Sequence, residues 1–134
     1  MWCRGIRGAT TVAGNPKEEI LAATRELLQK MIDSNDLEKE AVACIFFTAT
    51  PDIDAEFPAA AARQLGWTET ALLCGQEMKV LGSLPKCLRI LILFNTEKKT
   101  DEIEHVYIRG AEVLRKELNN PGGQSDACGN EDRL

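Results

Sequence analysis

At Lys86-Cys87-Leu88-Arg89-Ile90-Leu91-Ile92-Leu93-Phe94, apolar side chains occupy both alternating sets of positions. Successive side chains of a strand point to opposite sides, so this pattern is typical of a strand buried on both faces. The run therefore predicts a buried β-strand over residues 87–94. Arg89 is the one charged residue between positions 87 and 94, and a buried guanidinium is costly unless it is paired and hydrogen-bonded.

Strand patterns also occur on both sides of this run, and they are rich in β-branched and aromatic side chains. They cover residues 2–12, 41–48 and 105–108, with a shorter one at 71–74. In the first of them, alternation places Cys3, Gly5 and Arg7 on one face. Residues 75–85 contain turn-forming glycine, serine and proline, so we expect a loop there.

Two segments have helical patterns. In the first, Asn15 supplies a capping side chain, Pro16 suits the first helical position, and apolar residues then recur at helical spacing as far as Ser34. The second begins at Phe57-Pro58 and ends at Gly66. Strands that alternate with two helices predict an α/β or α+β fold with the helices on one side of the sheet.

The composition is that of one globular domain with little affinity for polyanions. The chain has 134 residues, of which 44% are hydrophobic and 28% charged, with a formal net charge of -5. Nucleic acids and anionic membranes are bound through clustered Lys and Arg, and the sequence has no such basic run, so we expect neither partner. We expect a domain over residues 1–118 and a flexible tail at 119–134, where large apolar residues are almost absent.

The cysteines indicate the compartment. They stand singly at positions 3, 44, 74, 87 and 128, an odd count with no C-x-x-C pair, which is typical of reduced intracellular thiols. The N-terminus has no apolar stretch of signal-peptide length, so we expect a cytoplasmic protein. With one histidine, His105, and no Gly-rich phosphate loop or dinucleotide motif, we expect neither a metal nor a cofactor.

Four side chains are candidates for binding an anion or shaping its site. Arg89 lies in the buried strand, Arg7 lies between glycines that would let a ligand approach, and Glu77 precedes the Arg89 strand closely enough to meet its guanidinium. Tyr107 offers a phenol that can orient a carboxylate. Each also has a common structural interpretation: an arginine that reaches water or a structural carboxylate, a solvated glutamate, or a packed tyrosine. Cys74 is a weak donor or a small buried hydrophobe, and no neighbour in the sequence would activate it as a nucleophile.

Several short motifs together resemble the AroH-class monofunctional chorismate mutases. They are Arg4-Gly5-Ile6-Arg7-Gly8-Ala9-Thr10-Thr11, Thr48-Ala49-Thr50-Pro51-Asp52 with Phe57-Pro58-Ala59, Cys74 to Met78, Lys86-Cys87-Leu88-Arg89 and His105-Val106-Tyr107. Their joint order and spacing, over nearly all of the chain except the tail, are specific. The resemblance implies a chorismate-mutase-like mixed sheet, a homotrimer with a pseudo-α/β-barrel at its centre, and active sites between adjacent subunits.

The resemblance also implies a role for each candidate residue. Arg89 would face the ether oxygen and a carboxylate of the substrate, and Arg7 would bind its ether-linked side. Glu77 would accept a hydrogen bond from the ring hydroxyl, and Tyr107 would bind a carboxylate. Further substrate-binding positions would be Leu73, Cys74, Gly75 and Gln76, with Phe57 and Arg63 reaching in from the neighbouring subunit.

One position departs from the family pattern: Ala60 stands where some members have a lysine. Arg63, one helical turn further on, would have to hold the outer carboxylate instead. The implied activity is the cofactor-independent, Claisen-type rearrangement of chorismate to prephenate in phenylalanine and tyrosine biosynthesis. Two alternatives are a fold-related trimer that resembles imine deaminases and a non-catalytic trimer that binds a small molecule.

Overall fold

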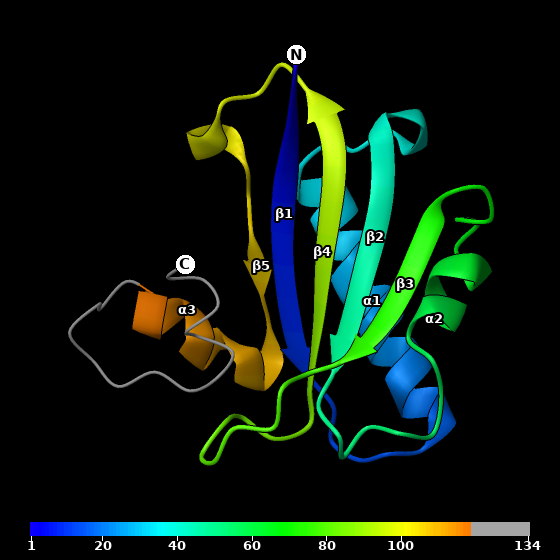
Figure 1. The fold of residues 1–134 in the computed structure, drawn as a ribbon, viewed down its shortest axis with the longest axis vertical. Helices are drawn as coiled ribbons and strands as arrows, with labels where there is room; N and C mark the ends of the chain where they lie inside the picture. The colour runs from blue at the N-terminus through cyan, green and yellow to red at the C-terminus, as the bar shows by residue number, and fades with distance from the viewer. Residues whose placement is uncertain (119–134) are drawn as a thin grey trace.

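The computed structural model describes residues 1–118, and the tail expected at 119–134 lies outside the described residues. Its elements are β1 (Trp2–Thr11), α1 (Lys17–Ser34), β2 (Val42–Ala49), α2 (Ala59–Gln64), β3 (Ala71–Gln76), β4 (Cys87–Thr96), β5 (Val106–Tyr107) and α3 (Glu112–Leu118), with 3-10 turns at Lys39–Ala41, Thr100–Glu102 and Arg109–Ala111. The strands form one sheet, α1 lies behind it, and α2 lies near the β3 edge (Figure 1).

The sheet is mixed, with the strand order β3-β2-β4-β1-β5. β4 runs antiparallel to both neighbours, whereas the outer pairs, β2 with β3 and β1 with β5, are parallel. The strand predicted at Cys87–Phe94 is therefore the centre of the sheet, and it extends to Thr96. The expected mixed sheet with helices on one side is confirmed for α1 and α2, which share one apolar core with the sheet.

The core lies between α1 and the sheet. Its largest fully buried side chains include Ile6, Ile20, Leu27, Leu28, Met31, Ile45, Phe47 and Ile92. Gly8 lies directly under α1, because a Cβ there would come within 2.3 Å of the Met31 sulfur. The glycines of β1 predict that another group comes close to the strand, and at Gly8 that group is the Met31 side chain of helix α1.

Local predictions were wrong at several boundaries. Asn15 does not cap α1: the N-cap is Pro16, without a side-chain hydrogen bond, and the Asn15 side chain binds Asp54 and Ala55 instead. Gly75 and Gln76 belong to β3 rather than a loop, because they pair in parallel with β2. β5 is shorter than the predicted 105–108, and α3 was not predicted.

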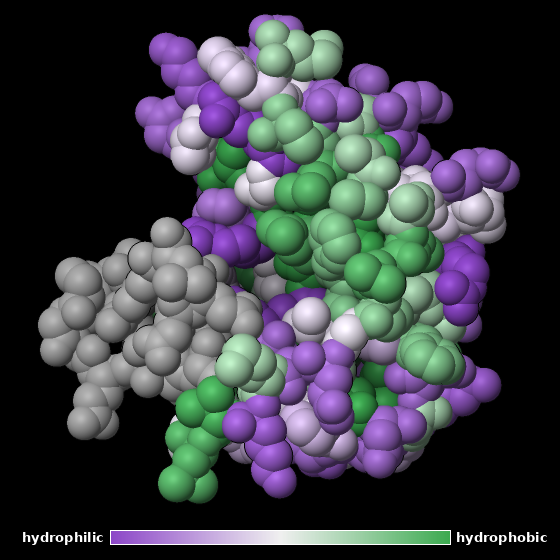
Figure 2. Space-filling model, in the orientation of Figure 1, coloured by the Kyte–Doolittle hydropathy of each residue, from purple (hydrophilic) through white to green (hydrophobic). Residues whose placement is uncertain are grey.

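The face of the sheet opposite α1 leaves apolar side chains in solvent. Leu73 and Leu91 are 60% and 37% exposed, and both pair with Phe46 in one row across β3, β2 and β4. Figure 2 shows apolar side chains gathered over the middle of the sheet on this side. At the β5 end, Leu114 of α3 packs with Ala9 and Tyr107 in a small second cluster.

Candidate active site

The register of the sheet brings candidate residues from separate strands onto one face. One row of paired residues runs through the sheet from β3 to β5: Gly75, Thr48, Arg89, Ala9 and Tyr107. Directly paired residues point to the same side of a sheet. Arg89 and Tyr107 therefore share the face opposite α1, and the small buried side chain of Ala9 separates them.

Arg7 joins this face because it precedes Ala9 by two residues on β1. It pairs with Leu91, and with Arg89 it lines a cavity of about 300 Å³. The remaining lining residues are Gly8, Phe46, Thr48, Ile90 and Leu91. Two guanidinium groups on one partly apolar cavity have the charge and the hydrogen-bond donors that a carboxylate requires, although the whole chain is acidic.

Glu77 forms an ion pair with Arg89, as its place in the sequence predicts. The Arg89 Nη1 and Glu77 Oε1 atoms lie 3.2 Å apart, and the two side chains are only 11% and 5% exposed. The backbone of Glu77 is held too, because its N–H donates to the carbonyl of Ala49 at 2.9 Å. The pair orients the planar guanidinium on the sheet, at the wall of the cavity that it shares with Arg7.

Tyr107 is buried at the other end of the row, against Ala9, Cys87 and Leu114. The Arg115 guanidinium carbon lies 5.7 Å from the centroid of its ring, which is within the range of a cation–π contact. Tyr107 is not among the residues that line the 300 Å³ cavity, but the shared row keeps it on the same face. We call Arg7, Glu77, Arg89 and Tyr107 the sheet-face cluster.

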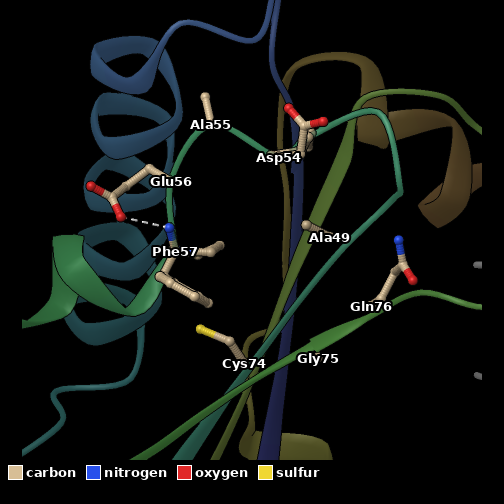
Figure 3. A pocket seen from close by; sticks show the side chains of 10 residues that line it. Ala49, Asp54, Ala55, Glu56, Phe57, Cys74, Gly75 and Gln76 are labelled. Atoms are coloured by element: carbon tan, nitrogen blue, oxygen red, sulfur yellow. Dashed lines mark hydrogen bonds between the residues drawn. The ribbon is translucent and has the colours of Figure 1, made fainter.

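A second cavity, which we call the edge cleft, lies between β3 and the loop before α2. Its volume is about 390 Å³, and it is lined by Ala49, Ile53, Asp54, Ala55, Glu56, Phe57, Pro58, Cys74, Gly75 and Gln76. Figure 3 shows Cys74 and Gln76 on the β3 side and residues 54–57 on the other. The structure thus brings together Phe57, Cys74, Gly75 and Gln76, apart from the two arginines.

The remaining candidates lie outside both cavities. Arg63 is exposed at the end of α2, and Leu73 points to the open face of the sheet. Ala60, where the family pattern has a lysine in some members, lies half-buried in the first turn of α2. Within one described chain, Arg63 therefore does not meet the arginines of the sheet-face cluster.

The topology also separates Cys74 from His105. Cys74 lies on β3 at one edge of the sheet, and His105 directly precedes β5 at the other. A cysteine thiol becomes a nucleophile when an adjacent base or positive charge favours its thiolate form, and the histidine is too distant to act in this way. Among residues 1–118, no group of three or more His, Cys, Asp or Glu side chains is arranged to hold a metal ion.

Several supporting residues were missed by sequence reasoning. Asp52 accepts hydrogen bonds from the Thr50 hydroxyl and the Lys86 N–H, which ties the turn after β2 to the start of β4. Burial alone would raise the pKa of Asp52, but these bonds and the Lys86 charge lower it. The turn at Thr50-Pro51-Asp52 was recognisable in the sequence, but its partner at Lys86 was not.

The loop before α2 is held in a similar way. The Phe57 N–H donates to Glu56, drawn as the dashed line in Figure 3, and Lys17 pairs with the same carboxylate. Both contacts lower the pKa of Glu56, the Phe57 N–H most. Asn15 binds the loop at Asp54 and Ala55, so Asn15 and the first residue of α1, Lys17, fix one wall of the edge cleft.

No helix among residues 1–118 is long and apolar enough to cross a membrane.

A family model described as chorismate mutase type I matches residues 3–118. The chain is 46% identical over 120 residues to chorismate mutase AroH of Bacillus subtilis (strain 168), covering 89% of this chain and 94% of that protein. It is 47% identical over 118 residues to chorismate mutase AroH of Thermus thermophilus, covering 87% and 97%. A solved chorismate mutase from Clostridium thermocellum is similar with a TM-score of 0.81 and 50% identity, covering 84% of this chain and 99% of that one.

Proposed function

The chain belongs to the type I chorismate mutases, an isomerase family that rearranges chorismate to prephenate on the way to phenylalanine and tyrosine, and we propose that the sheet-face cluster is its catalytic centre. One observation carries this proposal: Arg89, oriented by Glu77, shares a cavity wall with Arg7. Chorismate is a dicarboxylate, so a site with two guanidinium groups suits it.

The chemistry explains why a base or nucleophile is not required. The rearrangement is unimolecular: a C–O bond breaks while a C–C bond forms, and no proton moves. As the ether bond stretches, its oxygen gains negative charge. A guanidinium fixed towards that oxygen binds the transition state more strongly than the substrate, and only such differential binding raises the turnover rate. We assign this role to Arg89, because the buried ion pair with Glu77 holds its orientation.

The other members of the cluster select the reactive conformer. Chorismate must place its enolpyruvyl arm over the ring, and holding both ends of the molecule in that geometry removes an entropic barrier. In our proposal Arg7 holds the ether-linked side and Tyr107 a carboxylate. Glu77 accepts the hydrogen bond of the ring hydroxyl with the part of its carboxylate that faces the ligand.

We further propose that a neighbouring copy of the chain completes each site, in a homotrimer with a pseudo-barrel at its centre. Two features support this proposal: the open face of the sheet carries exposed Leu73 and Leu91, and Phe57 and Arg63 are exposed and do not line the cavity of Arg7 and Arg89 in their own chain. In this arrangement the edge cleft of one chain meets the cluster of the next. Because the cysteines stand singly in the sequence, as is typical of reduced intracellular thiols, we also propose a cytoplasmic location.

The decisive experiment is subunit complementation. Arg89→Ala and Arg63→Ala chains are purified separately, mixed in denaturant, refolded together and assayed by the loss of chorismate absorbance. If sites form between copies, random assembly leaves roughly a quarter of them with both arginines, so at subsaturating chorismate, where Arg63→Ala sites bind little substrate, the mixture exceeds the mean of its parents. A mixture no more active than the mean of its parents would exclude a shared site, and sedimentation would report the assembly directly.

The same assay on the unaltered chain tests the alternatives. An imine-hydrolysing enzyme would need a group that activates water, and a sensor would bind chorismate without consuming it. Chorismate loss with prephenate formation is expected from the unaltered protein, without added metal or cofactor.

A further inference from the structure

The single histidine of the chain joins the strands that carry Arg7 and Tyr107. The main-chain N–H of Arg7 donates to the His105 Nδ1 atom at 3.0 Å. β5 pairs with β1 only from Gly8 to Ala9, so its main chain does not reach Arg7. The imidazole supplies the next acceptor and extends the pairing by one bond. An Nδ1 atom that accepts a hydrogen bond carries no proton.

The backbone around His105 is held from both sides. Asn35, which is buried at the end of α1, donates to the carbonyl of Glu104 and accepts from its N–H, each at 2.9 Å. On the other side, the Arg115 guanidinium donates to the carbonyl of His105 at 3.0 Å. The backbone that carries the imidazole is therefore fixed, and the hydrogen bond from the imidazole to the Arg7 N–H fixes the position of Arg7 relative to it.

We propose that His105 is a positioning residue for the rearrangement: it sets the spacing between the Arg7 guanidinium and the Tyr107 phenol. Tyr107 follows His105 by two residues, and Arg7 is bonded to His105 directly. Arg7 and Tyr107 are proposed to bind the same substrate molecule, so a shift of β1 against β5 changes the substrate conformer that the site selects. A misplacement of about 1 Å costs on the order of a hundredfold in rate. This inference rests on the proposed roles of Arg7 and Tyr107.

Three substitutions of the full chain test the inference: His105→Asn, His105→Gln and His105→Leu. The Asn Oδ1 atom lies as many bonds from Cα as Nδ1 does, so it can accept from Arg7, whereas the Gln Oε1 atom lies one bond further away. We expect the Leu and Gln variants to lose about tenfold or more in kcat/KM and the Asn variant to stay within about threefold of the unaltered enzyme. Thermal unfolding of all variants is measured in parallel.

Two results would overturn the inference: an Asn variant no better than the Gln variant, or a Leu variant with unaltered kcat/KM. If the Leu variant does not fold, the comparison of Asn with Gln still decides. A merely structural role predicts that activity at room temperature follows stability, and not the position of the acceptor atom.

A matched series separates this inference from the proposed function. If Arg7→Ala and Tyr107→Phe both keep full activity, the assignment of the sheet-face cluster fails. If Arg7→Ala loses activity while His105→Leu keeps it, the positioning role alone fails. His105→Leu should also add little in an Arg7→Ala background, because residues that act through one another are not additive. Full additivity would contradict the role.

Discussion

The sheet-face cluster and the edge cleft differ in how their side chains are held. Glu77 and Arg89 are nearly buried and paired with one another, on or directly beside strands of the sheet. Phe57 in the edge cleft is 68% exposed, and Arg63, which lies outside the cleft on the short helix α2, is exposed too. In the edge cleft, Asn15 and Glu56 hold the backbone of the loop before α2, while the Phe57 side chain stays in solvent.

The difference indicates a division of work. Charges that are fixed before the substrate arrives cost no reorganisation during the reaction, so they stabilise the transition state most. Exposed side chains become ordered only when something covers them, and the interactions they then make hold substrate and transition state alike. Substitutions in the sheet-face cluster should therefore lower kcat, whereas those at the edge cleft should raise KM.

The strongest test of this division is Arg89→Lys. The substitution keeps the charge but loses the planar fork that Glu77 holds and the substrate is proposed to meet. We expect kcat to fall by more than about a hundredfold, which corresponds to roughly 2.7 kcal/mol in the barrier. The assay is chorismate absorbance, and Arg109→Lys, an exposed arginine paired with Glu26, is the matched control. Near-normal turnover in Arg89→Lys would refute the assigned role.

Glu77→Gln should have the next largest effect. Glutamine keeps the size and one acceptor oxygen, but it removes the charge that orients Arg89. Hydrogen bonds to charged groups contribute about 1.5–3 kcal/mol, so we expect kcat/KM to fall between about tenfold and a hundredfold. Glu69→Gln serves as the control, because that glutamate is exposed far from the cluster. An effect confined to KM would show that Glu77 contributes to substrate binding and not to stabilisation of the transition state.

Much of the fold followed from local patterns. The apolar run around Arg89, the helical spacing up to Ser34 and the strand at residues 41–48 identify β4, α1 and β2, because burial and periodicity are written in neighbouring residues. Gly75 and Gln76 were predicted as loop because their strand depends on pairing with β2, which is distant in sequence. Asn15 has the residue type of a cap, but a tertiary partner, Asp54, takes its side chain.

The site was predictable in part. Periodicity alone left Arg89 open between a structural arginine and a ligand, and only the family resemblance linked it with Arg7, Glu77 and Tyr107. The structure confirms the contact of Glu77 with Arg89. His105 was missed as a partner of Arg7 because the two lie 98 residues apart, and no local pattern reports such a bond.

Phe57→Ala and Arg63→Ala test the exposed side chains that we propose to bind the substrate from the neighbouring chain. We expect each to raise KM about three- to tenfold while kcat stays within about twofold. The reason is that these exposed groups should bind the substrate and the transition state equally well. Gln64→Ala, also exposed on α2, is the control for changes to the helix surface. A loss of kcat comparable to that in Glu77→Gln would show that the edge cleft, for Phe57, or helix α2, for Arg63, takes part in the chemical step.

The smallest effect is expected at Asp52, where the two regions are joined. Its carboxylate binds the turn that leads to the edge cleft to Lys86 at the start of β4. Because the fold lowers the pKa of Asp52, the ionised form stabilises the folded state above the unfolded pKa of about 3.9. This stability is lost as the pH falls through the lower, folded pKa. The group is largely exposed, so the contribution should stay below about 1 kcal/mol.

Thermal unfolding between about pH 6 and pH 3 measures this contribution in the unaltered chain and in Asp52→Asn. Near neutral pH the variant should unfold slightly earlier, and the difference should shrink at the acid end, where Asp52 of the unaltered chain is protonated as well. Asp101→Asn, on an exposed turn, controls for the loss of one surface charge. A difference that stays constant with pH would assign the role of Asp52 to its shape and not to its charge, and the link between the two regions would then rest on the Thr50 hydrogen bonds to Cys87.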